Sequence, residues 1–169
     1  MKEVIQLVNG MQAAGVIENY AIFGAIAQMR YTEPVVTLDV DVLVSVPSPE
    51  RMDSLAGIYA YCRERGYLPE GEAIRVAEWP VQFLPAFNPL AREAMEQAET
   101  VDFEGLPVRV VRPDYLAVLA LVTGRQKDHE RILSLLESES TTRIEIEKLS
   151  IRHGLTQAWQ QFVKRYLDA

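Results

Sequence analysis

The strongest strand signal in the 169-residue sequence is the segment VTLDVDVLV, residues 36–44. Neighbouring apolar residues extend the predicted strand to residues 35–46, because β-branched side chains favour extended backbone. Side chains alternate between the two faces of a strand, so the valine and leucine residues at even positions form one apolar face. Asp39 and Asp41 share the opposite face. Aspartate is rare in strands and like charges repel, so this pair indicates a site that offsets the repulsion.

A divalent cation would offset that repulsion. Mg²⁺ prefers oxygen ligands and commonly binds one or two carboxylates together with water and substrate phosphates. Two aspartates at positions i and i+2 can hold such an ion, and we therefore predict Asp39 and Asp41 as ligands of Mg²⁺ or Mn²⁺. The alternative is a solvated strand face that carries two acids by chance. The valine-rich setting favours the metal.

A glycine turn precedes this strand by a short interval. Residues 20–23 are a strand candidate, Gly24 ends it, and a helix is predicted from Ala25. Glycine permits a sharp turn with close backbone approach, and the free N–H groups of a helix start suit a phosphate. Most such junctions bind nothing. The 15-residue separation between Gly24 and Asp39 is what gives this junction weight.

The rest of the sequence alternates helix and strand patterns and then becomes helical. Ser48-Pro49-Glu50 is typical of a helix start, and Gly66 of its end. Thr142 and Glu145 have capping-box spacing. We predict further helices at 3–16, 88–98, 113–123, 128–138, 142–153 and 156–167. Residues 73–77 and 80–84 are predicted as two strands or one bent strand, and 101–103 with 107–111 as a hairpin. The class is α/β (α+β): a mixed sheet flanked by helices in residues 1–112, with a C-terminal helical subdomain packed on it in residues 113–169.

Composition limits the classes of function. Apolar residues make up 49% and charged residues 24% of the chain, as in ordinary globular proteins. The net charge of −7 argues against general binding to nucleic acid. No apolar run approaches the roughly 18 residues of a membrane span, and the N-terminal residues lack a signal-peptide pattern, so we expect a cytoplasmic protein. The single cysteine, Cys62, is expected to be a packing residue.

Taken together, these motifs resemble a known signature. Gly24-Ala25, then Arg30, then the Asp39-Val40-Asp41 strand resemble the turn and strand of the DNA-polymerase-β-like nucleotidyltransferase superfamily. The later segments Pro113-Asp114-Tyr115-Leu116 and Gly124-Arg125-Gln126-Lys127-Asp128 resemble elements of the branch that contains AbiEii-type toxins. The likeness covers roughly residues 18–138.

The resemblance implies a nucleotidyltransferase fold and a reaction. Asp39 and Asp41 would hold Mg²⁺, and the Gly24-Ala25 turn would hold the β- and γ-phosphates of a nucleoside triphosphate. A nucleotidyl group would pass to a hydroxyl of an acceptor, and pyrophosphate would be released. The resemblance also implies a toxin–antitoxin or defence setting, with an antitoxin or another protein as partner. Further implied site residues are Asp128 as catalytic and Arg30, Thr37, Gln82, Arg125 and Lys127 as nucleotide-binding. The alternative for Asp128 is that it caps the helix after it, with Arg125 and Lys127 solvated.

Three positions depart from the family pattern. Ala25 lacks the hydroxyl of a serine, Ala120 replaces a common lysine, and Gln82 stands where a third carboxylate is usual. An amide cannot act as a general base, although Glu33 or Glu78 is a candidate for the missing acid and Lys127 for the missing cation. The alternative functions are therefore a catalytically degenerate module that binds nucleotide or protein, and an interaction protein with no cavity beside Gly24.

Overall fold

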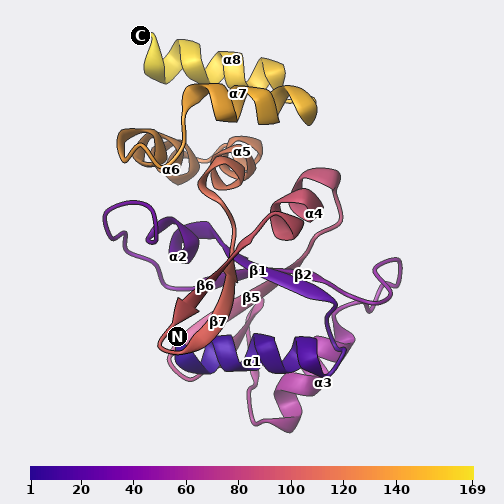
Figure 1. Ribbon diagram of the computed structural model, residues 1–169. Coiled ribbons are helices and arrows are strands. Elements are labelled where there is room, and N and C mark those ends of the chain that lie inside the picture. The colour runs from indigo at the N-terminus through magenta and orange to yellow at the C-terminus, as the bar shows by residue number, and fades with distance from the viewer.

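The computed structural model describes residues 1–169 and contains one seven-stranded sheet with helices on both faces (Figure 1). This confirms the predicted mixed α/β class. The strands are β1 (Asn19–Phe23), β2 (Val40–Ser45), β3 (Pro69–Glu70), β4 (Ala73–Val76), β5 (Trp79–Pro85), β6 (Glu99–Phe103) and β7 (Leu106–Val110). The helices are α1 (Lys2–Ala13), α2 (Gly24–Gln28), α3 (Ala56–Glu64), α4 (Pro89–Glu96), α5 (Pro113–Thr123), α6 (Gln126–Glu137), α7 (Arg143–Arg152) and α8 (Thr156–Phe162), followed by a π-helical turn, Val163–Leu167.

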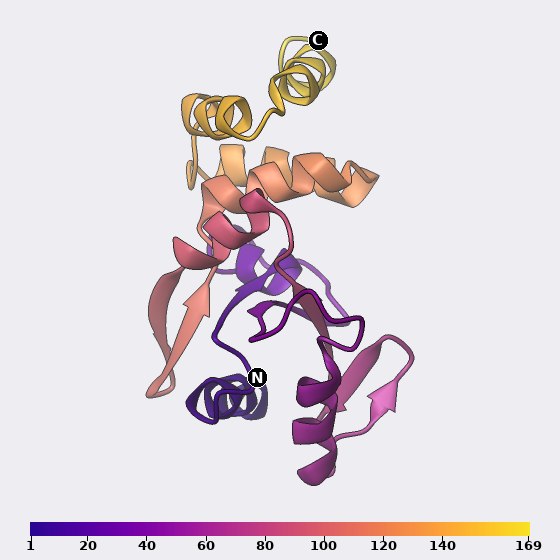
Figure 2. The same ribbon diagram turned by 90° about the vertical axis from the view of Figure 1, so that its right-hand side faces the viewer.

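The sheet is mixed, in the order β3-β4-β5-β2-β1-β7-β6. β2 runs antiparallel to β1 and parallel to β5, and β1 runs parallel to β7. Antiparallel hairpins, β3–β4 and β6–β7, form the two edges and project on opposite sides of the molecule (Figure 2). The predicted hairpin is confirmed: Glu104 and Gly105 have φ of 50° and 83°, the backbone of a tight two-residue turn.

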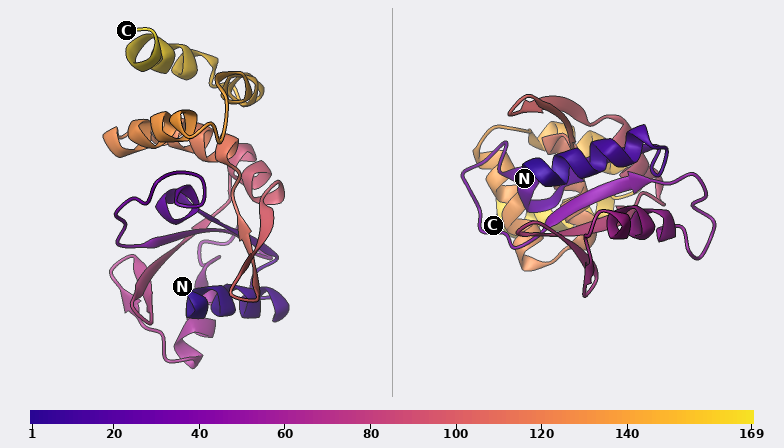
Figure 3. Two further views of the ribbon diagram at one scale, coloured as in Figure 1. Left: turned by 60° about the vertical axis from the view of Figure 1, so that its left-hand side comes forward. Right: turned by 90° about the horizontal axis from the view of Figure 1, so that it is seen from below.

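Helices α1 and α3 cover one face of the sheet, and one continuous hydrophobic core extends from them to the helices on the other face (Figures 1 and 3). Four apolar side chains along one side of α1 are buried, and so are the alternate valines of β2. Burial of such surface is the main driving force for folding. The residues are Val4, Leu7, Val8 and Met11 of α1 and Val40, Val42 and Val44 of β2. Cys62 of α3 belongs to the same core, as predicted, and burial raises the pKa of its thiol to about 11.

The other face carries α2, α4 and the C-terminal helices (Figure 1). α5 packs against α6 and α7, and α8 packs against α7. The predicted cap of α7 is present, because Thr142 Oγ1 accepts from Glu145 N at 3.2 Å, and α4 is capped in the same way by Asn88 Oδ1, which accepts from Ala91 N at 2.8 Å. None of the helices combines the length and the apolar character needed to cross a membrane.

The predicted start of β2 at residue 35 is wrong, because β2 begins at Val40. Phe23, the last residue of β1, pairs with Asp41, and Val40 pairs with Val81 of β5. Beyond these pairs the chain turns away from β1, and on β5 Pro80 precedes Val81 and has no N–H to donate. Residues 35–39 therefore have no strand partner and form a loop, in which Val36 and Leu38 are 96% and 82% exposed.

The predicted helix start at Ser48 is also wrong. Residues 49–55 form successive turns, and α3 begins at Ala56, although Gly66 follows its end as predicted. A short helix needs tertiary packing to be stable. Met52, the one large apolar side chain between Ser48 and Leu55, is fully exposed, so the cap signal has no core contact to support it. The two-residue strand β3 was not predicted.

Candidate active site

A cavity of about 590 Å³ lies above the carboxylate face of β2. The loop of residues 35–39 borders it, and α2, α5 and α6 complete its lining. Eight of the ten predicted site residues line this cavity: Gly24, Ala25, Thr37, Asp39, Asp41, Arg125, Lys127 and Asp128. Segments that are about 100 residues apart in sequence therefore meet at one site. The cavity contradicts the interaction-protein alternative, which required that none lie beside Gly24.

Gly24 occupies the junction between β1 and α2 with a φ of +66°, a backbone conformation that is costly for residues with a Cβ. A Cβ built here would lie 3.2 Å from Asp41 Cγ and would overlap the carboxylate oxygen Oδ2. The turn therefore approaches Asp41 as closely as it does because position 24 has no side chain. α2 has only five residues, so its dipole contributes little, and the turn itself must provide most of any phosphate contact.

Asp39 and Asp41 both line the cavity, although Asp39 lies just before β2 and not within it. Thr37 Oγ1 donates a hydrogen bond to the backbone oxygen of Asp39 at 3.0 Å and so shapes the loop there. Burial raises the pKa of Asp41, and the negative charge of Asp39 raises it further. The positive charges of Arg131, Lys127 and Arg125 act in the opposite direction. The site therefore brings two carboxylates and three cations within electrostatic range.

Asp128 is 1% exposed and holds two of these cations. Its Oδ2 accepts from Arg125 Nε at 2.7 Å and from the Arg125 backbone N at 3.2 Å, which is the helix-capping contact of the alternative interpretation. Its Oδ1 accepts from Arg131 Nη1 at 3.3 Å. Burial raises the pKa of Asp128, but the hydrogen bonds and charge of Arg125 and the charge of Arg131 outweigh burial and leave it below its usual value.

Arg131 and Gln28 are site residues that the sequence did not reveal. Arg131 lines the cavity with its side chain only 13% exposed, and its Nε donates to Gln28 Oε1 at 3.0 Å. Gln28 is itself 4% exposed and belongs to α2, 103 residues earlier. The only available sequence signal was that Arg131 lies one helical turn after Asp128. The α2 partner that fixes the guanidinium is visible only in the fold.

Two predicted residues do not line the cavity. Gln82 pairs with Asp41 in the parallel register of β5 and β2, so it lies directly beside that carboxylate on the same face of the sheet. Arg30 is exposed, with its guanidinium 5.9 Å from the centroid of the Tyr31 ring. Glu33 and Glu78, the candidates for the missing acid, are also exposed and outside the cavity.

The chain contains no group of three or more histidine, cysteine, aspartate or glutamate side chains placed to hold a metal ion. Four acidic residues line the cavity, Asp39, Asp41, Asp128 and Glu130. Asp128 is occupied by Arg125 and Arg131, and Glu130 accepts a hydrogen bond from Gln126, which leaves Asp39 and Asp41 as the pair without an arginine or glutamine partner. Two carboxylates suit Mg²⁺, which completes its coordination with water and phosphate oxygens. They suit zinc poorly, because a zinc site normally needs three or four protein ligands.

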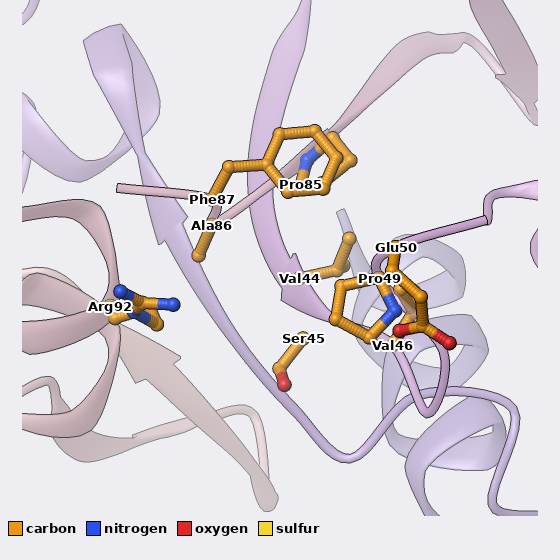
Figure 4. A pocket seen from close by; sticks show the side chains of 9 residues that line it. All are labelled: Val44, Ser45, Val46, Pro49, Glu50, Pro85, Ala86, Phe87 and Arg92. Carbon is orange, nitrogen blue, oxygen red and sulfur yellow. The ribbon is translucent and has the colours of Figure 1, made fainter. Parts of the chain in front are cut away.

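A smaller cavity of about 280 Å³ lies at the other end of β2 (Figure 4). Val44, Ser45 and Pro85 contribute to its lining, with Glu50 and Arg92 on opposite sides. It contains no pair of carboxylates and no close glycine turn. The candidate active site is accordingly the larger cavity at Asp41.

The sequence matches no protein-family profile and no curated protein. Solved structures do match. An antigenic nucleotidyltransferase-like protein from Paracoccidioides brasiliensis aligns with a TM-score of 0.57 and 14% identity, over 93% of this chain and 90% of that one. The antibiotic-resistance factor ANT(2″)-Ia aligns over 96% of this chain and 97% of its own at 14% identity. Its TM-scores are 0.52 in solution and 0.53 in the crystal with adenylyl-2″-tobramycin.

Identities of 14% are evidence of shared architecture and of nothing finer. The alignments extend over nearly the whole of each chain. The AbiEii-like branch is not tested by these structures and stays a sequence-based prediction. The sheet, the helices on its two faces and their order along the chain are those of the nucleotidyltransferase fold.

Proposed function

We propose that this protein transfers a nucleotidyl group from a nucleoside triphosphate to a hydroxyl group, with Mg²⁺ bound by Asp39 and Asp41. The observation that carries the proposal is the contact between Asp41 and the Gly24 turn, beside a cavity that also contains Arg125, Lys127 and Arg131. Carboxylates for a cation and cations for phosphates are thereby present in one cavity. The nucleotidyltransferase fold supports this chemistry.

In this proposal each residue of the cavity has one role. The Gly24-Ala25 turn, Lys127 and Arg131 bind and orient the triphosphate. Asp128 and Gln28 act as positioning residues, because they hold the Arg131 guanidinium through hydrogen bonds. Mg²⁺, when bound, neutralises phosphate charge and polarises the phosphoryl oxygen.

The transfer step balances without a redox partner. The acceptor hydroxyl oxygen forms a bond to the α-phosphorus, and the bond from that phosphorus to the bridging oxygen breaks. Pyrophosphate leaves with the electron pair of the broken bond, and the hydroxyl proton passes to water. Gln82 cannot take this proton, because its amide is not basic.

The test is transfer from ATP labelled at the α-phosphate, in the presence of Mg²⁺. Asp41→Asn should lower transfer by at least about a hundredfold, the upper end of what even outer-shell partners of metal ligands cost. Asp53→Asn is the matched control, because Asp53 is 58% exposed and pairs only with Arg51. Circular dichroism checks that both variants fold. Undiminished transfer by Asp41→Asn would refute the proposed function.

A second function, nucleotide binding without turnover, is favoured by Gln82 alone. This amide lies beside Asp41, where a third carboxylate is usual in the family that the sequence resembles. In that case wild-type protein binds ATP in calorimetry but releases no pyrophosphate, and Gln82→Glu, which restores a carboxylate of equal size, gains release. Pyrophosphate release by the wild type would exclude this alternative.

The sequence resemblance to AbiEii-type toxins adds a biological setting to the proposal. We propose that transfer occurs in the cytoplasm within a toxin–antitoxin or defence system, with an antitoxin as protein partner. Expression of the wild type should then slow growth, and Asp41→Asn should not. Equal growth with both proteins would rule out the toxin role while leaving the transfer reaction in place.

A further inference from the structure

The sheet face that carries Asp41 continues into a second cavity of about 570 Å³. Leu43 lies two residues after Asp41 and Leu84 two residues after Gln82, so all four side chains project from the same face. Leu43 and Leu84 are directly paired in the parallel register. The second cavity shares three lining residues with the first, Phe23, Leu119 and Thr123. The two cavities therefore adjoin, and the carboxylates lie toward one end of the combined space.

The second cavity is mainly apolar. Leu84 is 38% exposed although β5 is an interior strand of the sheet, and Val122 of α5 is 55% exposed. Both line the cavity, together with the first turn of α4 and the end of α7. Exposed apolar side chains that gather in a concave site favour a ligand with apolar surface.

The charged groups of this cavity are largely neutralised by a partner outside it. Arg152 and His153 line the cavity, and both contact Glu93, which does not line it. Arg152 Nη2 lies 3.0 Å from Glu93 Oε1, which also accepts a hydrogen bond from Tyr115 at 2.9 Å. No aspartate or glutamate lines the cavity. A ligand with several amino groups would find no carboxylate to bind there.

We propose that this second cavity binds the acceptor of the transfer reaction, and that the acceptor is a small molecule with an apolar aromatic or aliphatic body, one reactive hydroxyl and no amino groups. The inference rests on the proposed function for the identity of the reaction. The volume falls within the range of about 300–1,000 Å³ that is typical of small-molecule sites. The shared residues Phe23, Leu119 and Thr123 mark where the hydroxyl would enter the carboxylate cavity.

The first experiment measures binding without nucleotide, so that it does not depend on catalysis. Naphthylethanol serves as the apolar hydroxyl probe and tobramycin as the polyamine probe, each titrated by calorimetry and amide NMR. Naphthylethanol should bind and shift the resonances of residues 84 and 122, whereas tobramycin should not. Val122→Glu should weaken naphthylethanol binding by about tenfold or more, because a carboxylate would have to be desolvated against the probe.

Ile144→Glu is the matched control. Ile144 is an exposed apolar residue of α7, 63% exposed, and does not line the cavity, so this variant should bind naphthylethanol as the wild type does. Val122→Thr, which keeps the shape of valine, provides a second test if Val122→Glu is unstable, and should weaken binding less. Equal affinity in the wild type and both Val122 variants, or stronger binding of tobramycin, would overturn the inference.

The second experiment separates the inference from the proposed function. With ATP and Mg²⁺, mass spectrometry should detect adenylylated naphthylethanol from the wild type and not from Asp41→Asn, although that variant still binds the probe. Probe binding without any product from the wild type would count against the proposed reaction, and with it the acceptor role. If Val122→Glu formed as much product as the wild type, the second cavity would not be the acceptor site, although the proposed reaction would be supported.

Discussion

At Gly24 the chain leaves β1 with a backbone angle that alanine reaches only at a cost of about 1–2 kcal/mol. The same cost applies at Gly71, whose φ is +64°, but a Cβ there meets nothing within 4 Å. The two positions thus share a backbone conformation and differ in the contact with Asp41. Comparing them separates general strain from damage to the site.

We expect Gly24→Ala to lower both the free energy of unfolding and the affinity for ATP with Mg²⁺, because the new methyl group must displace Asp41. Gly71→Ala should lower the free energy of unfolding by the backbone cost alone and leave ATP affinity unchanged. Urea unfolding and calorimetry provide the two measurements. ATP affinity equal to wild type in both variants would show that the turn does not contribute to the site.

Asp128 is the second residue on which the site depends. Asp128→Asn leaves Arg131 buried without its charged partner and should cost about 3–5 kcal/mol, as the loss of one member of a buried ion pair does. The pKa of Asp128 in the folded state lies below its usual 3.8. Its contribution to stability is therefore present at neutral pH and is lost as the pH falls below about 4 through the lowered pKa.

Urea midpoints between pH 7 and pH 2 test this expectation. Stability of the wild type should fall over the acid part of this range, and Asp128→Asn should show a shallower fall from a lower starting value. Glu137→Gln, at an exposed position of the same helix, should match the wild type throughout. Identical acid profiles for the wild type and Asp128→Asn would contradict the assignment of the buried pairs.

Elements differ in how far sequence alone predicts them. α1, α4, the β6–β7 hairpin and the four C-terminal helices follow from local patterns, because caps, turns and apolar stripes act within a few residues. The starts of β2 and α3 do not. β2 begins where its pairing begins, opposite Phe23 of β1 and Val81 of β5, and α3 starts only where its side chains reach the core. Both boundaries depend on tertiary contacts that local propensity does not contain.

One observed cap, at Thr142, and one cap predicted only from sequence, at Ser48, test whether local signals or tertiary contacts decide where a helix starts. Thr142→Ala should lower the free energy of unfolding by about 1 kcal/mol, because it removes an N-cap hydrogen bond from α7. Ser48→Ala should have little effect, since no helix starts at Ser48 in the structure. Urea unfolding of the two variants is the measurement. If Ser48→Ala lowered the free energy of unfolding as much as Thr142→Ala does, a helix beginning at Ser48, as the sequence predicts, would be supported.

Across the whole molecule, the candidate site combines what sequence shows with what only folding reveals. Spacing and strand alternation pointed to the Gly24 turn and the two aspartates, although Asp39 lies in the loop before β2. Arg131 and its support by Gln28 were not, because their hydrogen bond joins segments 103 residues apart. The second cavity, of about 570 Å³, likewise needs β2, β5, α5 and α7 together. A chain with a net charge of −7 thus presents local cations where a triphosphate would bind.

The two outer strands have a consequence for how copies of this protein meet. β3 is only two residues long, and β6 bears Glu99 and Asp102 among its five residues. An unpaired strand edge can recruit another chain by backbone hydrogen bonding, and short or charged edges oppose this. One edge of the sheet is therefore a very short strand and the other an acidic strand. Both disfavour backbone hydrogen bonding between the sheets of neighbouring molecules, and so oppose edge-to-edge aggregation.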